Sequence, residues 1–274
     1  MALASVVCAV LVVGVVLVAT GSVTDSPKPD ADAGEASPDT TSPSITLPGS
    51  ALPGNGLPGN GSGALSPDQA VLRQLGVRQS DVGPGFVVGL LRNGDQVVGE
   101  TSLDLCNATF ASESRRAARR QEIVAAPDGT GVFSTEAVFY DDAGGTAQAF
   151  TELRSVAAKC PSSPVPGPDG SGSDVTTFNA PPDASWPRTP MVERLAFDFT
   201  TTRAGGTTDH SVAVYLRRGR VLIGIYFARP DPQASIAGRT TMRDIVNEFA
   251  ARLAKLPPSI VTGHEAPAAV PGAI

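Results

Sequence analysis

The chain has 274 residues, of which 41% are hydrophobic, enough for a sizeable core, while its 29 glycines and 24 prolines predict that part of the length stays unpacked. Its formal charge is −6, and the acidic excess lies mainly in residues 22–65, so that the remainder is close to neutral. A nearly neutral folded part lacks the basic face on which nucleic-acid-binding proteins depend, so nucleic acid is excluded as an expected partner.

The first predicted element is the apolar stretch ALASVVCAVLVVGVVLVA in residues 2–19, which carries no charged side chain. About 18 apolar residues reach the lower limit for a helix that crosses a bilayer. We therefore expect residues 1–21 to form one transmembrane helix, which makes the membrane a partner of the protein. A cleaved signal peptide is the alternative, because the small residues before Ser22 loosely fit its cleavage rule. Cys8 is expected to be an apolar residue of this helix rather than a lipidation site.

Residues 22–65 are rich in Asp, Ser, Thr, Pro and Gly, and they contain the repeat LPGSA-LPGNG-LPGNG. Such a segment cannot bury enough apolar surface to offset the entropy lost on ordering. It is therefore predicted to be a disordered spacer that holds a domain away from the membrane. Residues 257–274, PPSIVTGHEAPAAVPGAI, are predicted to form a disordered tail.

One folded domain is predicted in residues 66–256. Ser66 and Pro67 are typical of the N-cap and first residue of a helix, which Gly76 would end. Residues 122–126 and 132–140 flank PDGTG and predict a β-hairpin. Residues 143–160 predict a helix with an apolar face.

The second half of this domain begins with a long loop in residues 161–190, which contains the only tryptophan, Trp186. Loops of this length inside a domain are often functional. The alternation in ERLAFDFTTT predicts a strand, and SVAVYLRRGRVLIGIYF predicts a hairpin that turns at Arg218 and Gly219. A last helix is expected in residues 236–256. Hairpins and long helices without a repeating strand–helix–strand rhythm predict an α+β fold, with helices packed on an antiparallel sheet.

Cys106 and Cys160 are the two cysteines of the predicted domain. Behind an export segment they favour a disulfide, because the space outside the cytoplasm is oxidising. Two separate buried thiols are the alternative. No metal site is expected, since the chain has only His210 and His264 as histidines and no CxxC motif.

The segments TSLDLCNATFASESRRAARRQ and AQAFTELRSVAAKC, with a hairpin between them that ends in a tyrosine, resemble the PknH-like extracellular sensor domain of actinobacteria. The resemblance covers residues 65–256. It implies a domain outside the membrane, in a stand-alone anchored or exported member, with a cleft that binds a ligand. We expect this domain to act by binding, without catalysis and without a cofactor. The chain departs from the kinase sensors of this family, which have two disulfides, because this domain has cysteines for one.

Four arginines lie close together after Cys106: Arg115, Arg116, Arg119 and Arg120. If residues 111–121 are helical, these arginines form two adjacent columns at i, i+4 spacing, where like charges repel by roughly a few tenths of a kcal/mol. A solvated face and structural salt bridges are two interpretations. The third is an anion site in which the four guanidinium groups and Trp186 are the candidate ligand-binding residues. Trp186 has a structural alternative as a cover for the core.

Catalysis would be a different class of function. Asp209 with His210 and Asp141 with Asp142 are the titratable pairs, but no GxSxG, HExxH or GxxxxGK[ST] motif accompanies them. A hydrolase or transferase of the envelope would need His210 to converge with a carboxylate and a nucleophile. A purely structural envelope protein is a further alternative, and it would lack a cleft lined by polar groups.

Overall fold

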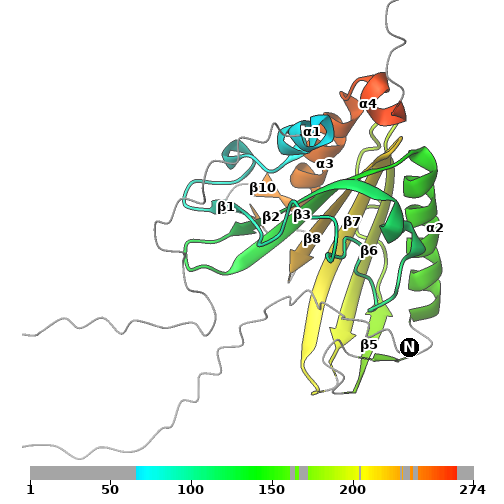
Figure 1. Cartoon of the computed structure of the whole chain (residues 1–274). Coiled ribbons are helices and arrows are strands. Elements are labelled where there is room, and N and C mark those ends of the chain that lie inside the picture. The colour runs from blue at the N-terminus through cyan, green and yellow to red at the C-terminus, as the bar shows by residue number, and fades with distance from the viewer. Residues whose placement is uncertain are drawn as a thin grey trace, which may run out of the picture. The chain divides into compact units, whose positions relative to one another are not determined.

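The computed structural model describes residues 66–160, 164–166, 172–203, 205–228, 230, 235–236 and 240–263. The predicted anchor, the spacer and the end of the tail lie outside these residues. No helix in the described ranges combines the length and the apolar character needed to cross a membrane. The described part has the predicted α+β architecture, with helices packed on an antiparallel sheet (Figure 1).

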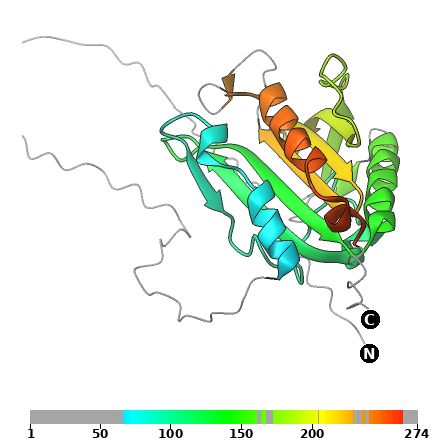
Figure 2. The same cartoon turned by 90° about the horizontal axis from the view of Figure 1, so that it is seen from above.

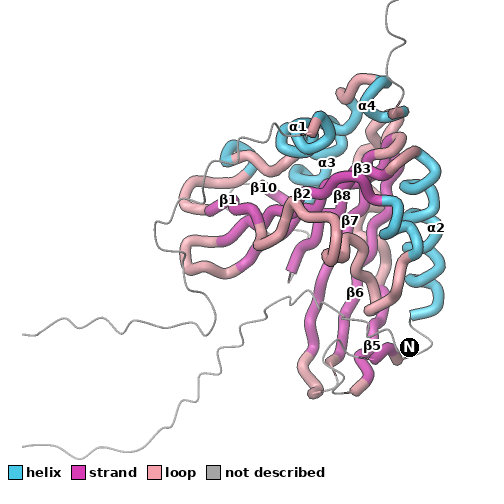
Figure 3. The backbone as a smooth tube through the Cα atoms, in the orientation of Figure 1, coloured by secondary structure: helices cyan, strands magenta, loops and turns pink. Residues whose placement is uncertain are grey.

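The sheet runs in the order β1-β2-β3-β8-β7-β6-β5-β4, and each neighbouring pair is antiparallel. The sheet has eight strands, of which β4 adds only two residues at one edge. The longer strands are the magenta segments of Figure 3. The strands are β1 Val87–Leu90, β2 Arg116–Ala125, β3 Gly131–Tyr140, β4 Val165–Pro166, β5 Ser173–Phe178, β6 Glu193–Thr202, β7 Thr208–Arg218 and β8 Val221–Ala228. A separate two-stranded ribbon pairs β9 Ser235–Ile236 with β10 Thr240–Thr241.

The helices lie on both faces of this sheet. They are α1 Pro67–Leu75, η1 Gln79–Asp81, η2 Ala111–Arg115, α2 Ala143–Lys159, α3 Met242–Ala254 and α4 Pro258–Thr262. Helices α1 and α3 lie side by side on one face, and α2 stands apart from them (Figure 2).

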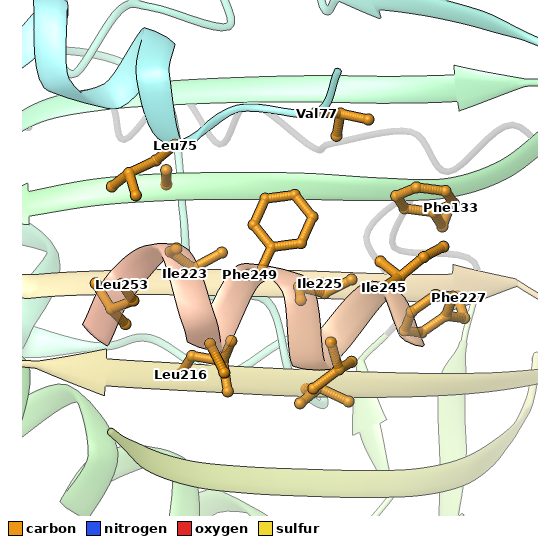
Figure 4. Close-up of a cluster of buried hydrophobic side chains, with 14 of the residues drawn as sticks. Leu75, Val77, Phe133, Leu216, Ile223, Ile225, Phe227, Ile245, Phe249 and Leu253 are labelled. Carbon is orange, nitrogen blue, oxygen red and sulfur yellow. The ribbon is translucent and has the colours of Figure 1, made fainter. Parts of the chain in front are cut away.

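Strand alternation sends side chains to both faces, so the sheet has a hydrophobic core on each. The first core lies between the sheet and helices α1 and α3, where Phe249 and Leu253 of α3 pack against Ile223 and Ile225 of β8 (Figure 4). The second core lies between the sheet and α2, where Phe150 and Leu153 pack in one cluster with Val138 and Tyr215. A binding site on either face of the sheet would therefore use the side chains that the core on that face leaves accessible to solvent.

Several predicted elements are confirmed. The side chain of Ser66 accepts a hydrogen bond from the Gln69 backbone N–H at 3.2 Å and caps α1. The hairpin of β7 and β8 turns where predicted, with Gly219 at φ +55°. A Cβ at Gly219 would lie 2.1 Å from the carbonyl oxygen of Val261, so this turn requires glycine for its space as well as for its conformation.

The predicted helix in residues 111–121 is wrong. Only the single 3₁₀ turn η2 forms, and the chain then enters β2 at Arg116. Along β2, Ala118 is buried in the first core while Arg119 is buried on the opposite face. Successive side chains of a strand point to opposite faces of the sheet, so β2 contributes side chains to both faces. The pairing of β2 with β3 thus overrides the helix propensity of the AARR sequence.

Three other boundaries are corrected. The predicted loop in residues 161–190 contains β5, which pairs with β6. The last helix begins at Met242 rather than at residue 236, because the side chain of Thr241 caps it by accepting from the Asp244 backbone N–H at 3.3 Å. The predicted tail begins with α4, which is held because the Arg220 backbone N–H donates to the Val261 carbonyl oxygen at 2.8 Å.

Candidate functional site

The four arginines do not share one surface. Arg115, at the end of η2, makes ion pairs with Asp141 at 2.9 Å and Asp142 at 2.8 Å. Arg120 lies on the first-core face of β2, where it pairs with Glu122 at 2.6 Å. Strand alternation places Arg119 on the opposite face, so the sequence cluster is divided between the two sides of the sheet.

Arg119 is fully buried and forms an ion pair with the buried Glu136 of β3. Its remaining donors reach the carbonyl oxygen of Asn93 at 3.0 Å and the side-chain oxygen of Gln121 at 2.6 Å. Burial raises the pKa of Glu136 from 4.5 to about 7, although the Arg119 guanidinium opposes this shift. The pair therefore joins the loop that follows β1 to the centre of the sheet.

Arg116 extends the same network toward the loop that precedes η2. It pairs with Glu113 at 3.2 Å and donates to the hydroxyl of Ser102 at 2.6 Å and to the carbonyl oxygen of Val97 at 3.1 Å. Glu113 in turn accepts the backbone N–H groups of Ser102 at 2.8 Å and Leu103 at 3.0 Å. Burial raises the pKa of Glu113, whereas these hydrogen bonds and Arg116 lower it.

All four predicted ligand-binding arginines are thus engaged with carboxylates, which favours the structural salt bridges that the sequence left open. An anion at these side chains would have to compete with carboxylates already in contact. Trp186 lies elsewhere, packed against the first core, with the Arg194 guanidinium 5.6 Å from its ring centre. The structure does not bring Trp186 together with Arg116 and Arg119, which are on the α2 side of the sheet.

The predicted disulfide between Cys106 and Cys160 is confirmed, with Cα atoms 6.2 Å apart. It joins the loop before η2 to the end of α2. Leu103 and Leu105, on the same loop, are buried in the second core. The disulfide, the leucines and the Arg116 network therefore hold residues 101–106 against the second-core face of the sheet.

Below this loop the sheet presents a row of aromatic rings, which we call the aromatic face: Phe178, Phe197, Phe199, Tyr215 and Tyr226. Each ring centre lies 5.7–6.2 Å from that of a neighbour. Tyr215 is fully buried, whereas the other four rings are half-buried and add partly exposed surface to the second core.

The aromatic face is joined directly to the loop, because the Tyr226 hydroxyl donates to the carbonyl oxygen of Ser102 at 3.1 Å. Asp104, two residues further on, is exposed to solvent, yet protein surrounds it closely enough that burial raises the pKa of its carboxyl, against the opposing effect of Arg203. Tyr226 likewise keeps some exposure although burial raises its pKa well above its ordinary value.

His210 belongs to the other face of the sheet. Its Nε2 lies 2.7 Å from a carboxylate oxygen of Asp198, which also accepts from the Asn179 side chain at 2.8 Å. No serine, threonine or cysteine of the described ranges is hydrogen-bonded to His210, so the histidine meets a carboxylate without a nucleophile. In the part of the chain that the structure covers, no three His, Cys, Asp or Glu side chains are grouped to hold a metal ion.

A pocket of about 230 Å³ lies between η1 and α3. It is lined by Ser80, Asp81, Asp244, Ile245, Glu248 and Phe249. Two of its three acids, Asp81 and Glu248, pair with Arg252, and the third, Asp244, accepts a hydrogen bond from the hydroxyl of the α3 N-cap residue Thr241 at 2.6 Å. Its acidic groups therefore have structural roles.

Sequence reasoning missed the aromatic face. The alternation of Phe197 and Phe199 in ERLAFDFTTT was used only to predict a strand, and Phe178 lay in a segment predicted to be a loop. The sequence signal for the aromatic face is the pair of aromatic residues two positions apart in ERLAFDFTTT, next to hydroxyl residues rather than aliphatic ones.

Comparison with known proteins gives a fold likeness at low similarity. No protein-family model and no curated protein matches the chain. Among solved structures, the chain is similar to the extracellular domain of PknH from Mycobacterium tuberculosis, with 14% identity, a TM-score of 0.38, and coverage of 66% of this chain and 91% of that one. It is also similar to a putative uncharacterized protein (Rv0999 ortholog) from Mycobacterium smegmatis, with 13% identity, a TM-score of 0.33, and coverage of 67% and 95%.

The first of these structures is the extracellular domain of the protein after which the resembled family is named. Both TM-scores are below 0.5, so neither structure assigns a function to this chain.

Proposed function

We propose that the described domain is a non-catalytic, sensor-type ligand-binding domain on the extracytoplasmic side of a membrane. The observation that carries the proposal is the aromatic face beneath the loop of residues 101–106. Residues 1–21 would tether the domain to the membrane, and residues 22–65 would act as its spacer. If residues 1–21 are cleaved, the same domain is secreted.

Partly exposed aromatic rings favour binding because covering them removes apolar surface from water. Each such ring carries roughly 150–250 Å² of surface, so covering the accessible part of four rings contributes a few kcal/mol at about 25 cal/mol per Å², before the costs of association. The rings are also held rigidly. They contact one another along strands β5 to β8, and a ligand would lose little free energy in ordering them.

The loop of residues 101–106 supports the same site from above. The Cys106–Cys160 disulfide and the contacts of Arg116 and Glu113 fix its position, so the loop is in place beside the rings before a ligand arrives. The disulfide also supports the extracytoplasmic location, because such bonds persist in oxidising compartments.

Binding is favoured over catalysis by the position of His210. Its partner Asp198 lies on the face opposite Phe199, away from the aromatic face. An envelope protein without a ligand is the other alternative, and the half-buried rings of the aromatic face argue against it.

The test uses a neutral apolar fluorophore, N-phenyl-1-naphthylamine, with the full chain in lipid nanodiscs and empty nanodiscs subtracted. We expect saturable binding that Phe199→Thr weakens at least fivefold. The matched control is Val175→Thr, because Val175 is 41% exposed on the adjacent strand and points to the opposite face. If both variants bind the fluorophore as the wild type does, the aromatic face is not the site and the proposal fails.

A further inference from the structure

We propose that the loop of residues 181–192 contacts the surface of a membrane that contains anionic lipids, with Met191 in the headgroup layer and Arg188 against lipid phosphates. This contact is separate from the aromatic face. It rests on one part of the proposed function, the tether, because residues 1–21 would hold the domain close to the bilayer.

Arg194, at the start of β6, holds this loop rigidly. Its buried guanidinium pairs with the buried carboxylate of Asp183 at 2.7 Å. It also donates to the carbonyl oxygens of Pro187 at 2.9 Å and Trp186 at 3.3 Å. The indole of Trp186 packs against the first core, with the same guanidinium 5.6 Å from its ring centre. The loop therefore presents its exposed residues in one conformation, and a partner does not have to order it.

Met191 is the residue of this loop whose presence folding does not explain. The Val192 N–H donates to the Thr189 carbonyl oxygen at 3.2 Å and closes a turn with Pro190 and Met191 at its centre. Met191 has a φ of +64°, and turns with a positive φ at this position favour glycine there. Its side chain is nevertheless 69% exposed. A large apolar side chain that is both strained and exposed adds little to stability, and such strain is typical of functional sites.

The exposed charge of the loop is positive. Arg188 is exposed and has no ion pair or hydrogen bond among the described residues. The loop's other charged residue, Asp183, is buried against Arg194. A free guanidinium close to an exposed methionine matches an anionic lipid, which offers a phosphate beside the first carbons of its acyl chains. A half-buried tryptophan suits the same layer, because its ring is apolar and its N–H is polar.

The loop lies at the end of the sheet where the chain enters the domain. Glu193, directly after the loop, pairs with Arg217 of β7, close to the turn between β7 and β8. Asp68, in the first turn of α1, forms an ion pair at 2.6 Å with Arg220 on the other side of that turn. The proposed spacer of residues 22–65 thus joins the end of the domain that carries the loop. A coil of that length reaches about 35–40 Å, so the loop stays within reach of the bilayer.

A membrane surface fits this loop better than a protein partner does. A stable protein interface buries about 1,600 Å² in total, far more than three side chains of one loop supply. A weak contact suffices for a tethered domain, because the tether keeps the loop at a high effective concentration beside the lipids.

The test uses Trp186 as the reporter, because it is the only tryptophan of the chain. The full chain is placed in nanodiscs of phosphatidylcholine and phosphatidylglycerol in equal amounts, with or without a lipid that carries a nitroxide on its headgroup. Co-elution in gel filtration verifies attachment. We expect the nitroxide to quench Trp186 fluorescence, with a ratio of quenched to unquenched Trp186 about fivefold lower in phosphatidylcholine alone. Met191→Ser should lower this ratio about tenfold and Arg188→Gln about fivefold.

Val98→Ser is the matched control and should leave the quenching unchanged. Val98 is 91% exposed and follows β1, at the sheet edge remote from β6. Met191→Gly separates the contact from stability. Because glycine suits the positive φ, this variant should lose quenching as Met191→Ser does, without a lower melting temperature.

Absence of quenching in chains that co-elute with the nanodiscs, or equal quenching of Met191→Ser and wild type, would overturn the inference. A change in Trp186 emission that depends on protein concentration and not on lipid would indicate a protein partner and overturn it as well. If the chain does not co-elute, the proposed tether fails and the inference fails with it. In each case the aromatic face is tested separately by Phe199→Thr, because Phe199 and Trp186 pack on opposite sides of the sheet.

Discussion

Replacing Arg119 by methionine should destabilise the domain strongly and in a pH-dependent way. The substitution keeps an unbranched side chain of similar reach but removes the guanidinium that pairs with the buried Glu136. Breaking a buried ion pair by removing one partner typically costs about 3–5 kcal/mol, because the other charge is left without compensation. Arg119 also loses its hydrogen bonds to Asn93 and Gln121, so the upper part of this range is expected at pH 8.

The pH dependence follows from Glu136. Its pKa in the folded wild type is about 7, above the ordinary 4.5, and without Arg119 it must rise further. At pH 5.5 the variant can therefore keep Glu136 protonated and neutral, which costs less than a buried unpaired carboxylate. The destabilisation should fall by at least 1 kcal/mol between pH 8 and pH 5.5.

The assay is equilibrium urea unfolding of wild type, Arg119→Met, Glu136→Gln and the double variant at both pH values. A coupling free energy of at least 1 kcal/mol at pH 8, with the double variant less destabilised than the sum of the single variants, is expected. A loss below 1 kcal/mol for Arg119→Met, or equal losses at the two pH values, would refute the assignment of this pair as a buried link between loop and sheet.

Three further outcomes are expected. In the wild type, Glu136 contributes stability that is fully present below pH 4.5 and is lost as pH rises to about 7, by up to about 3 kcal/mol. Glu136→Gln should remove this part of the dependence of the free energy of unfolding on pH. An unchanged pH dependence in urea unfolding would contradict this prediction. Replacing both Cys106 and Cys160 by serine should cost about 4 kcal/mol, since the disulfide spans 54 residues, and the exported wild type should resist alkylation at both cysteines unless it is first reduced. Gly219→Ala should cost more than 2 kcal/mol in the same unfolding assay, because of its positive φ and the Val261 carbonyl oxygen, whereas a loss near zero would show that this turn can relax.

The sequence predicts the local elements that carry their own signals. The Ser66–Pro67 helix start, the strand of residues 193–202 and the turn at Gly219 follow from capping, alternation and glycine, and each lies where expected. The disulfide was predicted from the compartment rather than from geometry.

Residues 111–121 were misassigned because their helix-forming composition is overridden by partners far along the chain. Glu136 and the carbonyl oxygens of residues 93–100 satisfy Arg119 and Arg116, and no pattern within β2 itself identifies them. The same holds for the site. Phe178 and Phe199 meet only through strand pairing, and residues 101–106 are held against the second-core face through the disulfide; both are properties of the tertiary fold.

The most direct test of the central claim is a fluorine NMR titration of the full chain, in nanodiscs, carrying fluorinated phenylalanine at its 10 Phe positions. Resonances are assigned by single Phe→Leu substitutions, and N-phenyl-1-naphthylamine is added. We predict saturable shifts for Phe178, Phe197 and Phe199, with Phe133 and Phe249 of the first core unchanged. Shifts confined to first-core phenylalanines, or no saturable shift at any of the three, would contradict the assignment of the aromatic face as the binding site.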